Sequence, residues 1–333
     1  MFTRPADLSD ETVASTVAAA WRARTGSIRR IEYAAVGFGS YHWHAWGDQR
    51  WFVTVDDLAV GRSQFGDSAT DVARRLTVAL GSARALRDAG LEFVVAPIPT
   101  IDGEVVRVVH GRWAVAVYPF VEGHTRQWGA FETAAERRAV VQLLATLHLR
   151  FAPALDHARR DDFTIPSRRE LHGALVDRAA AWTAGPYGES AHQLVRRHAG
   201  LLEDRFARYD RLAASAADQP ERMVLTHGEP HAANTIDTTD GVVLIDWDTA
   251  LIAPPERDLW WFAGEEPACL GHYLACTGVE PRPEILELYR LRWDLTEVSL
   301  FVAMFHAPHT DNADTRVAWE GLRHSLEALR DPT

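Results

Sequence analysis

Leu225-Thr226-His227-Gly228-Glu229-Pro230-His231-Ala232-Ala233-Asn234 is the stretch that decides the fold, and Ile245-Asp246-Trp247 follows it after a short interval. Between the two lies the turn signal Thr238-Thr239-Asp240-Gly241. The pattern predicts a polar loop, a short strand, a tight turn and a second strand. Such a hairpin brings the amide oxygen of Asn234 and the carboxylate of Asp246 together. Hard oxygens suit Mg²⁺, which takes few protein ligands and shares the rest with water and phosphate.

Glu229 lies five residues before Asn234 and is placed to face the same point. A base, two metal ligands and a hairpin describe a phosphoryl-transfer site of the protein-kinase-like kind. The pattern resembles the aminoglycoside phosphotransferase and choline kinase superfamily, in which His-Gly-Asp-x-x-x-x-Asn precedes Ile-Asp-Trp or Ile-Asp-Phe. The resemblance implies that Glu229 stands at the catalytic base and that Asn234 and Asp246 hold Mg²⁺. It further implies that His227 braces the loop and that Asp258 ties the loop to the helix behind it.

The chain departs from the family pattern at the base, where Glu229 replaces Asp. The reference pKa values of Glu and Asp are about 4.3 and 3.9, so the base strength is adequate. The side chain is longer by one methylene, and a misplacement of about 1 Å can cost on the order of a hundredfold in rate. We expect a small displacement of the loop to absorb this length, so that Glu229 orients the acceptor hydroxyl. The alternative is a degenerate site that binds its ligand but does not transfer a phosphoryl group.

A second departure is the absence of lysine, since all 35 basic residues are Arg. In the family, a Lys on the third strand contacts the nucleotide phosphates. The segment 51–57 places Thr54 at about that position. Arg62, Arg74 and Arg75 are near in sequence and could supply charge, although the planar guanidinium is not equivalent to an ammonium group.

The length and composition predict a two-lobed soluble protein. A chain of 333 residues exceeds one compact core, and 47% hydrophobic with 24% charged residues is typical of globular proteins. The net charge of -11 argues against a nucleic-acid partner and is compatible with a cationic substrate. No apolar run approaches the roughly 20 residues that span a bilayer, and residues 1–10 lack a signal-peptide layout. We expect a cytoplasmic protein without a membrane partner.

The order of the predicted elements gives the fold class. We predict an α+β, bilobal, protein-kinase-like fold with a small mixed N-lobe over residues 1–118. The larger, mainly helical C-lobe over residues 119–333 would carry the catalytic loop, the metal site and the substrate-binding helices. The expected strands are 28–36, 41–46, 51–55, 105–109 and 113–117. The expected helices are 7–25, 67–89, 133–149, 166–182, 191–214, 257–262, 284–306 and 316–329.

Two segments of the predicted N-lobe are candidates for nucleotide binding. Gly37, Gly39 and Ser40 lie between two predicted strands, where glycines let backbone amides close over phosphates. An ordinary hairpin turn is the alternative. Tyr118 and Phe120 lie where the sheet ends, and match the hinge at which backbone groups meet adenine; a plain connecting loop is the alternative. The expected nucleotide is ATP, with GTP not excluded.

Three residues are candidates for binding the substrate. His231 lies inside the catalytic loop, where it could touch phosphate or substrate or could brace the loop. Asp294 and Glu297 are spaced i and i+3 on a predicted helix and can share a face. In the resembling antibiotic kinases, C-terminal helices present carboxylates to the amines of the substrate. A solvated helix face is the alternative.

The resemblance implies an ATP-dependent O-phosphotransferase. Its acceptor would be a hydroxyl of a small cationic or sugar-containing molecule, such as an aminoglycoside or aminocyclitol antibiotic of the spectinomycin or hygromycin class. One alternative is a metabolic kinase that acts on an amino alcohol, a sugar or a homoserine-like compound. Another is a relative that binds nucleotide or ligand without catalysis.

Overall fold

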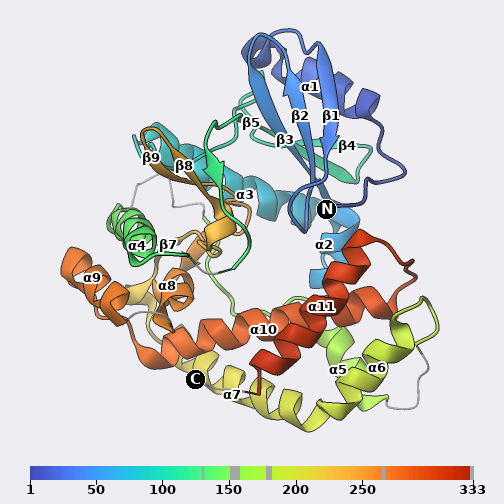
Figure 1. Ribbon diagram of the computed structural model, residues 1–333, viewed down its shortest axis with the longest axis vertical. Helices are drawn as coiled ribbons and strands as arrows, with labels where there is room; N and C mark the ends of the chain where they lie inside the picture. The colour runs from blue at the N-terminus through green and yellow to red at the C-terminus, as the bar shows by residue number, and fades with distance from the viewer. Residues whose placement is uncertain (130, 151–157, 178–181, 265–266, 331–333) are drawn as a thin grey trace. The chain divides into compact units, whose positions relative to one another are not determined.

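The computed structural model describes residues 1–129, 131–150, 158–177, 182–264 and 267–330 (Figure 1). The contacts within the chain divide it into two compact units. Unit 1 comprises Met1–Gly61, Ser68–Asp161 and Arg222–Pro281, and unit 2 comprises Arg62–Asp67, Asp162–Glu221 and Arg282–Thr333. The predicted division into an N-lobe over residues 1–118 and a C-lobe over residues 119–333 follows a different criterion from these contact-based units, and it stays a prediction. No helix in the described ranges is both long and apolar enough to cross a membrane.

Unit 1 contains a five-stranded antiparallel sheet in the order β1-β2-β3-β5-β4. The strands are β1 (Arg30–Ala34), β2 (Tyr41–Trp46), β3 (Arg50–Asp57), β4 (Arg107–Val109) and β5 (Trp113–Pro119). The register places Thr54 between His42 of β2 and Ala116 of β5. These strands confirm the five that the sequence predicts, with ends that differ by a few residues.

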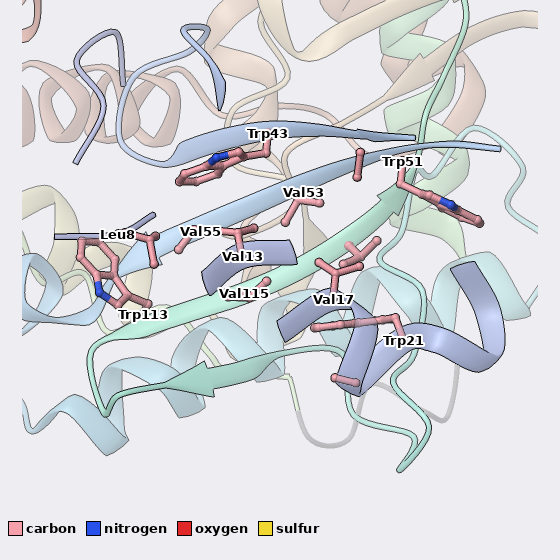
Figure 2. Close-up of a cluster of buried hydrophobic side chains, with 13 residues drawn as sticks. Leu8, Val13, Val17, Trp21, Trp43, Trp51, Val53, Val55, Trp113 and Val115 are labelled. Atoms are coloured by element: carbon pink, nitrogen blue, oxygen red, sulfur yellow. The ribbon is translucent and has the colours of Figure 1, made fainter. Parts of the chain in front are cut away.

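One face of this sheet packs on helix α1 (Asp10–Thr25), as Figure 2 shows. Trp43, Val53 and Val117 from the sheet meet Val17 and Trp21 from the helix in a buried core. Two indoles at this contact have a hydrogen-bond acceptor: Trp43 Nε1 donates to Asp10 Oδ1 at 2.7 Å, and Trp21 Nε1 donates to the Ile98 carbonyl at 2.9 Å. Because side chains alternate along a strand, the residues between these core positions point to the opposite face.

Helices α2 (Leu58–Phe65) and α3 (Ala69–Asp88) follow the third strand. The sequence predicts α3, whose first turn is capped by Ser68 accepting from the Asp71 amide. Leu76, Leu80 and Leu86 lie buried on one side of α3, at the spacing expected for a helix. The short helix α2 was not predicted.

The predicted hairpin is present and belongs to unit 1. Strands β8 (Thr235–Thr238) and β9 (Gly241–Leu244) pair antiparallel, and β6 (His124–Thr125) adds to β8. Strand β7 (Val224–Thr226) pairs with β10 (Leu251–Ala253) and leads directly into the loop. Helices α4 (Ala134–Leu149), α8 (Glu256–Ala263) and α9 (Pro267–Thr277) pack together beside these strands. Helix α9 was not predicted.

Unit 2 is helical, with α10 (Pro283–His306) in contact with α11 (Ala313–Ala328), α7 (Ala199–Ala217), α5 (Arg168–Val176) and α6 (Gly188–Arg197). The prediction of one helix over 191–214 is wrong. At His198 the backbone departs from helical geometry (φ -107°, ψ 8°), and its Nδ1 bonds to the Leu194 carbonyl, so α6 ends and α7 begins there. The helix predicted over 166–182 ends at Val176, and residues 178–181 lie outside the described ranges.

Candidate active site

Asp258 of α8 holds the start of the catalytic loop. Its Oδ2 accepts the His227 amide at 2.9 Å, and its Oδ1 accepts the Gly228 amide at 2.6 Å. The carboxyl is fully buried. Burial alone would raise the pKa of Asp258, but hydrogen bonding and charge from His148, with the charges of His227 and Arg257, bring it below its ordinary value. Asp258 is therefore a buried carboxylate, and it ties the loop to the helix behind it as the resemblance implies.

A second layer of buried side chains supports Asp258. His148 Nε2, from α4, lies 3.0 Å from Asp258 Oδ2. The other ring nitrogen of His148 lies 2.9 Å from the hydroxyl of Tyr273, from α9. Three helices thus converge on the loop through a continuous set of hydrogen bonds.

The backbone at Gly228 requires glycine. Its φ is +102°, and an added Cβ would lie 2.3 Å from Arg257 Nη2. That guanidinium cannot easily move, because Nη1 donates to Thr226 Oγ1 at 2.8 Å and Nη2 donates to the Thr249 carbonyl at 2.9 Å. The Gly of the His-Gly-Glu motif is therefore fixed by close packing against a buried arginine.

His227 connects the loop to the end of the hairpin. Its Nδ1 accepts the Glu229 amide at 3.2 Å, so the ring proton lies on Nε2, which donates to the Ile245 carbonyl at 2.8 Å. Burial lowers the pKa of His227 to about 4, which keeps the imidazole neutral. These contacts give His227 the bracing geometry that the sequence predicts.

Asn234 and Asp246 are brought together by the same hairpin. The Ile245 amide donates to the Asn234 carbonyl at 3.0 Å, which fixes the two segments side by side. Asn234 Nδ2 donates to the Glu229 carbonyl at 2.9 Å, and the amide nitrogen is thereby committed to the loop. Asp246 has a left-handed backbone (φ +65°), an uncommon conformation for a residue with a side chain.

The carboxyl of Asp246 lies in an acidic environment. Asp246 is exposed, but loss of solvent around its carboxyl, followed by the charges of Glu229 and Asp56, raises its pKa to about 7. Burial and the charges of Asp246, Glu229 and Asp56 raise the pKa of Asp248 well above its ordinary value. Burial also raises the pKa of Asp56 to about 6, against the hydrogen bond from Ser40.

This donor set fits a divalent cation. Carboxyl groups that raise one another's pKa are stabilised as anions when a metal ion binds among them. No group of three or more His, Cys, Asp or Glu side chains within the described ranges is arranged to hold a metal. Asn234 and Asp246 would be a smaller set, of the kind that leaves Mg²⁺ most of its positions for water and phosphate, and their role as metal ligands stays a prediction.

The sequence prediction missed two acidic residues: Asp56, on the face of the sheet opposite α1, and Asp248, in the turn that follows β9. Asp56 lies two residues after Thr54 on β3 and so points to the same face, and Asp248 lies two residues after Asp246. Tyr118, predicted as a hinge residue, is buried, and its hydroxyl bonds to Thr54. Burial and the nearby charges of Asp246, Asp56 and Asp248 raise the pKa of Tyr118, so its phenol is neutral. Alternation along the strand was the signal that could have identified Asp56.

The predicted phosphate loop is held by its last residue. Gly37 and Gly39 have φ values of +70° and +102°, in the region that favours glycine. Ser40 Oγ donates to Asp56 Oδ1 at 2.6 Å, which ties the loop to the end of β3. His42, next along β2, has its pKa lowered to about 4 by burial and is neutral.

Phe120 is held at the end of β5. Its amide donates to the Arg50 carbonyl at 3.3 Å, and the Arg50 guanidinium lies 3.6 Å from the centre of its ring. Only the backbone carbonyl of Phe120 is thus left to meet a nucleotide, and nucleotide binding at Tyr118 and Phe120 stays a prediction.

Of the arginines near Thr54 in sequence, Arg74 pairs with Asp71 at 2.7 Å on α3, and its side chain is 73% exposed.

Glu229 and His231 face each other across the loop. His231 Nε2 lies 3.9 Å from Glu229 Oε2 and 3.2 Å from Asn234 Nδ2. Burial would raise the pKa of Glu229, but the nearby imidazole of His231, with the charges of Arg257 and His227, lowers it below its ordinary value. Glu229 is therefore a carboxylate and can accept a proton or a hydrogen bond.

The other two predicted substrate residues belong to unit 2. Asp294 and Glu297 lie on α10. Burial raises the pKa of Asp294 to about 7, against the charge of Arg290. Their role toward a substrate stays a prediction.

Comparison with known proteins identifies the family of this chain. The model of the phosphotransferase enzyme family matches residues 35–301. Protein StrN of Streptomyces griseus is 34% identical over 253 residues, which cover 74% of this chain and 75% of StrN.

Solved structures show the same fold at low identity. A spectinomycin phosphotransferase, solved with ADP and spectinomycin, has a TM-score of 0.74 at 14% identity and covers 98% of this chain and 99% of its own. An ethanolamine kinase of Plasmodium vivax has a TM-score of 0.59 at 9% identity, with 97% and 89% covered. The predicted α+β, protein-kinase-like fold is confirmed. The chain belongs to the phosphotransferase enzyme family and is a small-molecule kinase whose acceptor is a hydroxyl group.

Proposed function

We propose that this enzyme transfers the γ-phosphoryl group of ATP to a hydroxyl of an aminoglycoside or aminocyclitol antibiotic of the spectinomycin or hygromycin class. The observation that carries the proposal is the position of Glu229. Its carboxylate is ionised at neutral pH and lies in the same loop as Asn234, one hydrogen bond from the hairpin that ends in Asp246. A base beside a metal site is the arrangement that phosphoryl transfer requires.

In the proposed reaction, Glu229 orients the acceptor hydroxyl and takes its proton. The hydroxyl oxygen forms a bond to the γ-phosphorus, the bond from this phosphorus to the bridging oxygen breaks, and ADP leaves with that electron pair. Asn234 and Asp246 would hold Mg²⁺, which neutralises charge on the phosphates. Asp258 and His227 act as positioning residues, because Asp258 holds the amides of His227 and Gly228 and His227 holds the amide of Glu229.

The class of acceptor is supported by the fold and by charge. The spectinomycin phosphotransferase aligns over nearly the whole of both chains, and the net charge of -11 favours a cationic molecule. The alignment to the ethanolamine kinase supports a second candidate, a metabolic kinase that acts on an amino alcohol. Both candidates use the same residues for phosphoryl transfer.

The test is ADP release with Mg-ATP across a panel of spectinomycin, hygromycin, ethanolamine and homoserine. We expect turnover with an antibiotic, and loss of at least about a thousandfold in kcat for Glu229→Gln, which keeps the shape but not the base. Turnover only with ethanolamine or homoserine would support the metabolic candidate. Wild-type turnover that survives in Glu229→Gln would rule out the assigned base.

A further inference from the structure

We propose that Cys276, His272 and Gln142 form a binding site for a borderline-soft divalent cation of the Zn²⁺ kind, which bridges helices α4 and α9. All three residues belong to unit 1 and lie in the described part of the chain. The site lies outside the catalytic loop and the hairpin, so it is independent of the proposed function.

Three donor atoms of different kinds meet between the two helices. His272 and Cys276 are four residues apart on α9, so their side chains share a face of this helix. Cys276 Sγ lies 3.7 Å from His272 Nε2 and donates to Gln142 Oε1 of α4 at 3.2 Å. His272 Nε2 lies 3.1 Å from the same oxygen. A sulfur, a nitrogen and an oxygen atom therefore form a closed triangle.

The triangle has nearly the size of one face of a tetrahedral zinc site. Zinc bonds of about 2.3 Å to sulfur and about 2.1 Å to nitrogen place these two atoms about 3.6 Å apart. The observed separation of Cys276 Sγ and His272 Nε2 is 3.7 Å. The same bond lengths require Gln142 Oε1 to withdraw from its present position by about 0.3–0.4 Å. Gln142 is exposed and unbranched, so a small rotation of its side chain achieves this shift.

The chemistry of the ligands selects the metal. Thiolate and imidazole suit Zn²⁺, whereas Mg²⁺ and Ca²⁺ take oxygen ligands. On binding, the thiol of Cys276 releases its proton to water, and the ring proton of His272 moves to Nδ1 so that Nε2 can bind the metal. His272 and Cys276 are half-buried, and water completes the fourth position.

The three side chains are available for a metal. Within the described ranges, the hydrogen bonds of their donor atoms connect them only to one another. A metal ion can therefore replace these hydrogen bonds without depriving a further polar group of its partner. The triangle is thus both nearly preformed and accessible from solvent.

A metal at this position links the two helices that support the catalytic loop. Helices α4 and α9 pack together (Figure 1). His148 of α4 bonds to Tyr273 of α9, and His148 also supports Asp258. His272 directly precedes Tyr273 along α9. The metal adds a second polar link between α4 and α9, and a ligand that binds only the folded protein raises its stability.

Titration with Co²⁺ tests the site, because Co²⁺ occupies tetrahedral zinc sites and a bound thiolate then gives a charge-transfer band in the near ultraviolet. Wild-type protein is titrated in excess Mg²⁺, which fills sites made only of oxygen ligands. Zn²⁺ is then added to displace Co²⁺. The chain has two cysteines, so Cys269→Ala is the matched control for Cys276→Ala. His324→Ala, at an exposed position of α11, is the control for His272→Ala.

We expect the charge-transfer band in wild type and in both control variants. The apparent Kd for Zn²⁺ should be about 1–100 µM, because the site has about half the strong ligands of a structural zinc site. The band should be absent from Cys276→Ala, and His272→Ala should weaken binding by at least about tenfold. Gln142→Glu places a charged oxygen on α4 and should tighten binding by about threefold to tenfold.

The melting temperature provides a second readout. Zn²⁺ should raise that of wild type and leave that of Cys276→Ala unchanged, while the two proteins unfold at similar temperatures without metal because Cys276 is only half-buried. No charge-transfer band in wild type, or a band that persists in Cys276→Ala, would overturn the site. Equal Zn²⁺ affinities of Gln142→Glu and wild type would overturn the bridge between α4 and α9.

Discussion

The imidazole of His148 lies 3.0 Å from the carboxylate of Asp258, and both side chains are buried. Asp258 uses its remaining capacity on the amides of His227 and Gly228. An ionised group is thus held in the interior by one imidazole and two backbone N–H groups. The loop that carries Glu229 depends on this arrangement.

His148→Ala should destabilise the fold by about 3–5 kcal/mol at pH 7, because it removes the imidazole that lies 3.0 Å from the buried carboxylate of Asp258. Urea unfolding measures the change. The matched control is Tyr273→Phe, which removes only the hydroxyl that bonds to His148 and should cost about 1 kcal/mol. If His148→Ala loses less stability than Tyr273→Phe, Asp258 does not need the imidazole.

Gly228→Ala should lower the free energy of unfolding by more than the backbone strain of a positive φ alone would. The added methyl group would lie 2.3 Å from Arg257 Nη2, whose two hydrogen bonds hold it in place. We expect a loss of about 2–4 kcal/mol in stability and a fall in kcat, because the shifted loop misplaces Glu229. Gly241→Ala is the control, since Gly241 has a φ of +124° but nothing within 4 Å of the added atom. Equal losses for the two variants would contradict the steric argument.

Asp56→Asn should stabilise the protein at high pH. Burial raises the pKa of Asp56 to about 6 in the folded state, above its ordinary value of 3.8. The folded state therefore binds more protons between pH 3.8 and 6, and stability falls as pH rises through this window. The neutral amide of the variant removes the cost of holding an ionised carboxyl in this place. For a pKa shift of this size the gain in folding free energy is at most about 2–3 kcal/mol, and the loss of the hydrogen bond from Ser40 reduces it.

Thermal unfolding of wild type and Asp56→Asn at pH 5 and pH 8 checks this expectation. The gain should be present at pH 8 and should shrink toward pH 4. Ser40→Ala is the partner control, because it removes the hydrogen bond that favours the ionised form. A gain that does not change with pH would indicate a cause other than the titration of Asp56.

Asp246→Asn should separate metal binding from folding. Without metal, the variant should be at least as stable as wild type at pH 8, because burial and neighbouring carboxylates raise the pKa of Asp246 to about 7. Addition of Mg-ATP should raise the melting temperature of wild type and leave that of the variant nearly unchanged. The kcat should fall by at least about a thousandfold. Equal stabilisation of the two proteins by Mg-ATP would remove Asp246 from the metal site.

The sequence predicts the hairpin and the loop well because their signals are local. The turn at Thr238–Gly241 and the apolar residues on each side specify the strands, and their spacing places Asn234 near Asp246. Helix α3 is equally clear, since a cap at Ser68 begins an apolar repeat. Each of these features depends on residues that are close along the chain.

Contacts between distant segments could not be predicted from the sequence. His148 and Tyr273 support Asp258 from helices more than 100 residues apart, and neither lies in a motif that indicates it. Trp128 meets His231 only because β6 joins the sheet of the hairpin. The end of α6 at His198 also escaped prediction, because the helical residues on both sides continue the same composition.

Thr54→Lys addresses the charge of the nucleotide site directly. Thr54 shares a face of β3 with Asp56, and its hydroxyl bonds to Tyr118, beside the acidic groups Asp246 and Asp248. The described side chains that raise the pKa of Asp248 are all acidic. A lysine at this position would meet those carboxylates in the free protein and the phosphates of bound ATP.

We expect Thr54→Lys to lower the KM for ATP by about threefold to tenfold at low salt, with a smaller gain at high salt because exposed charge is screened. The matched control is Thr54→Gln, which has comparable length without charge and should not improve binding. Isothermal titration with Mg-ATP gives the affinity independently of turnover. If Thr54→Lys binds Mg-ATP no better than Thr54→Gln, the phosphates are neutralised by another group, and the strand position of the family lysine has no part in this enzyme.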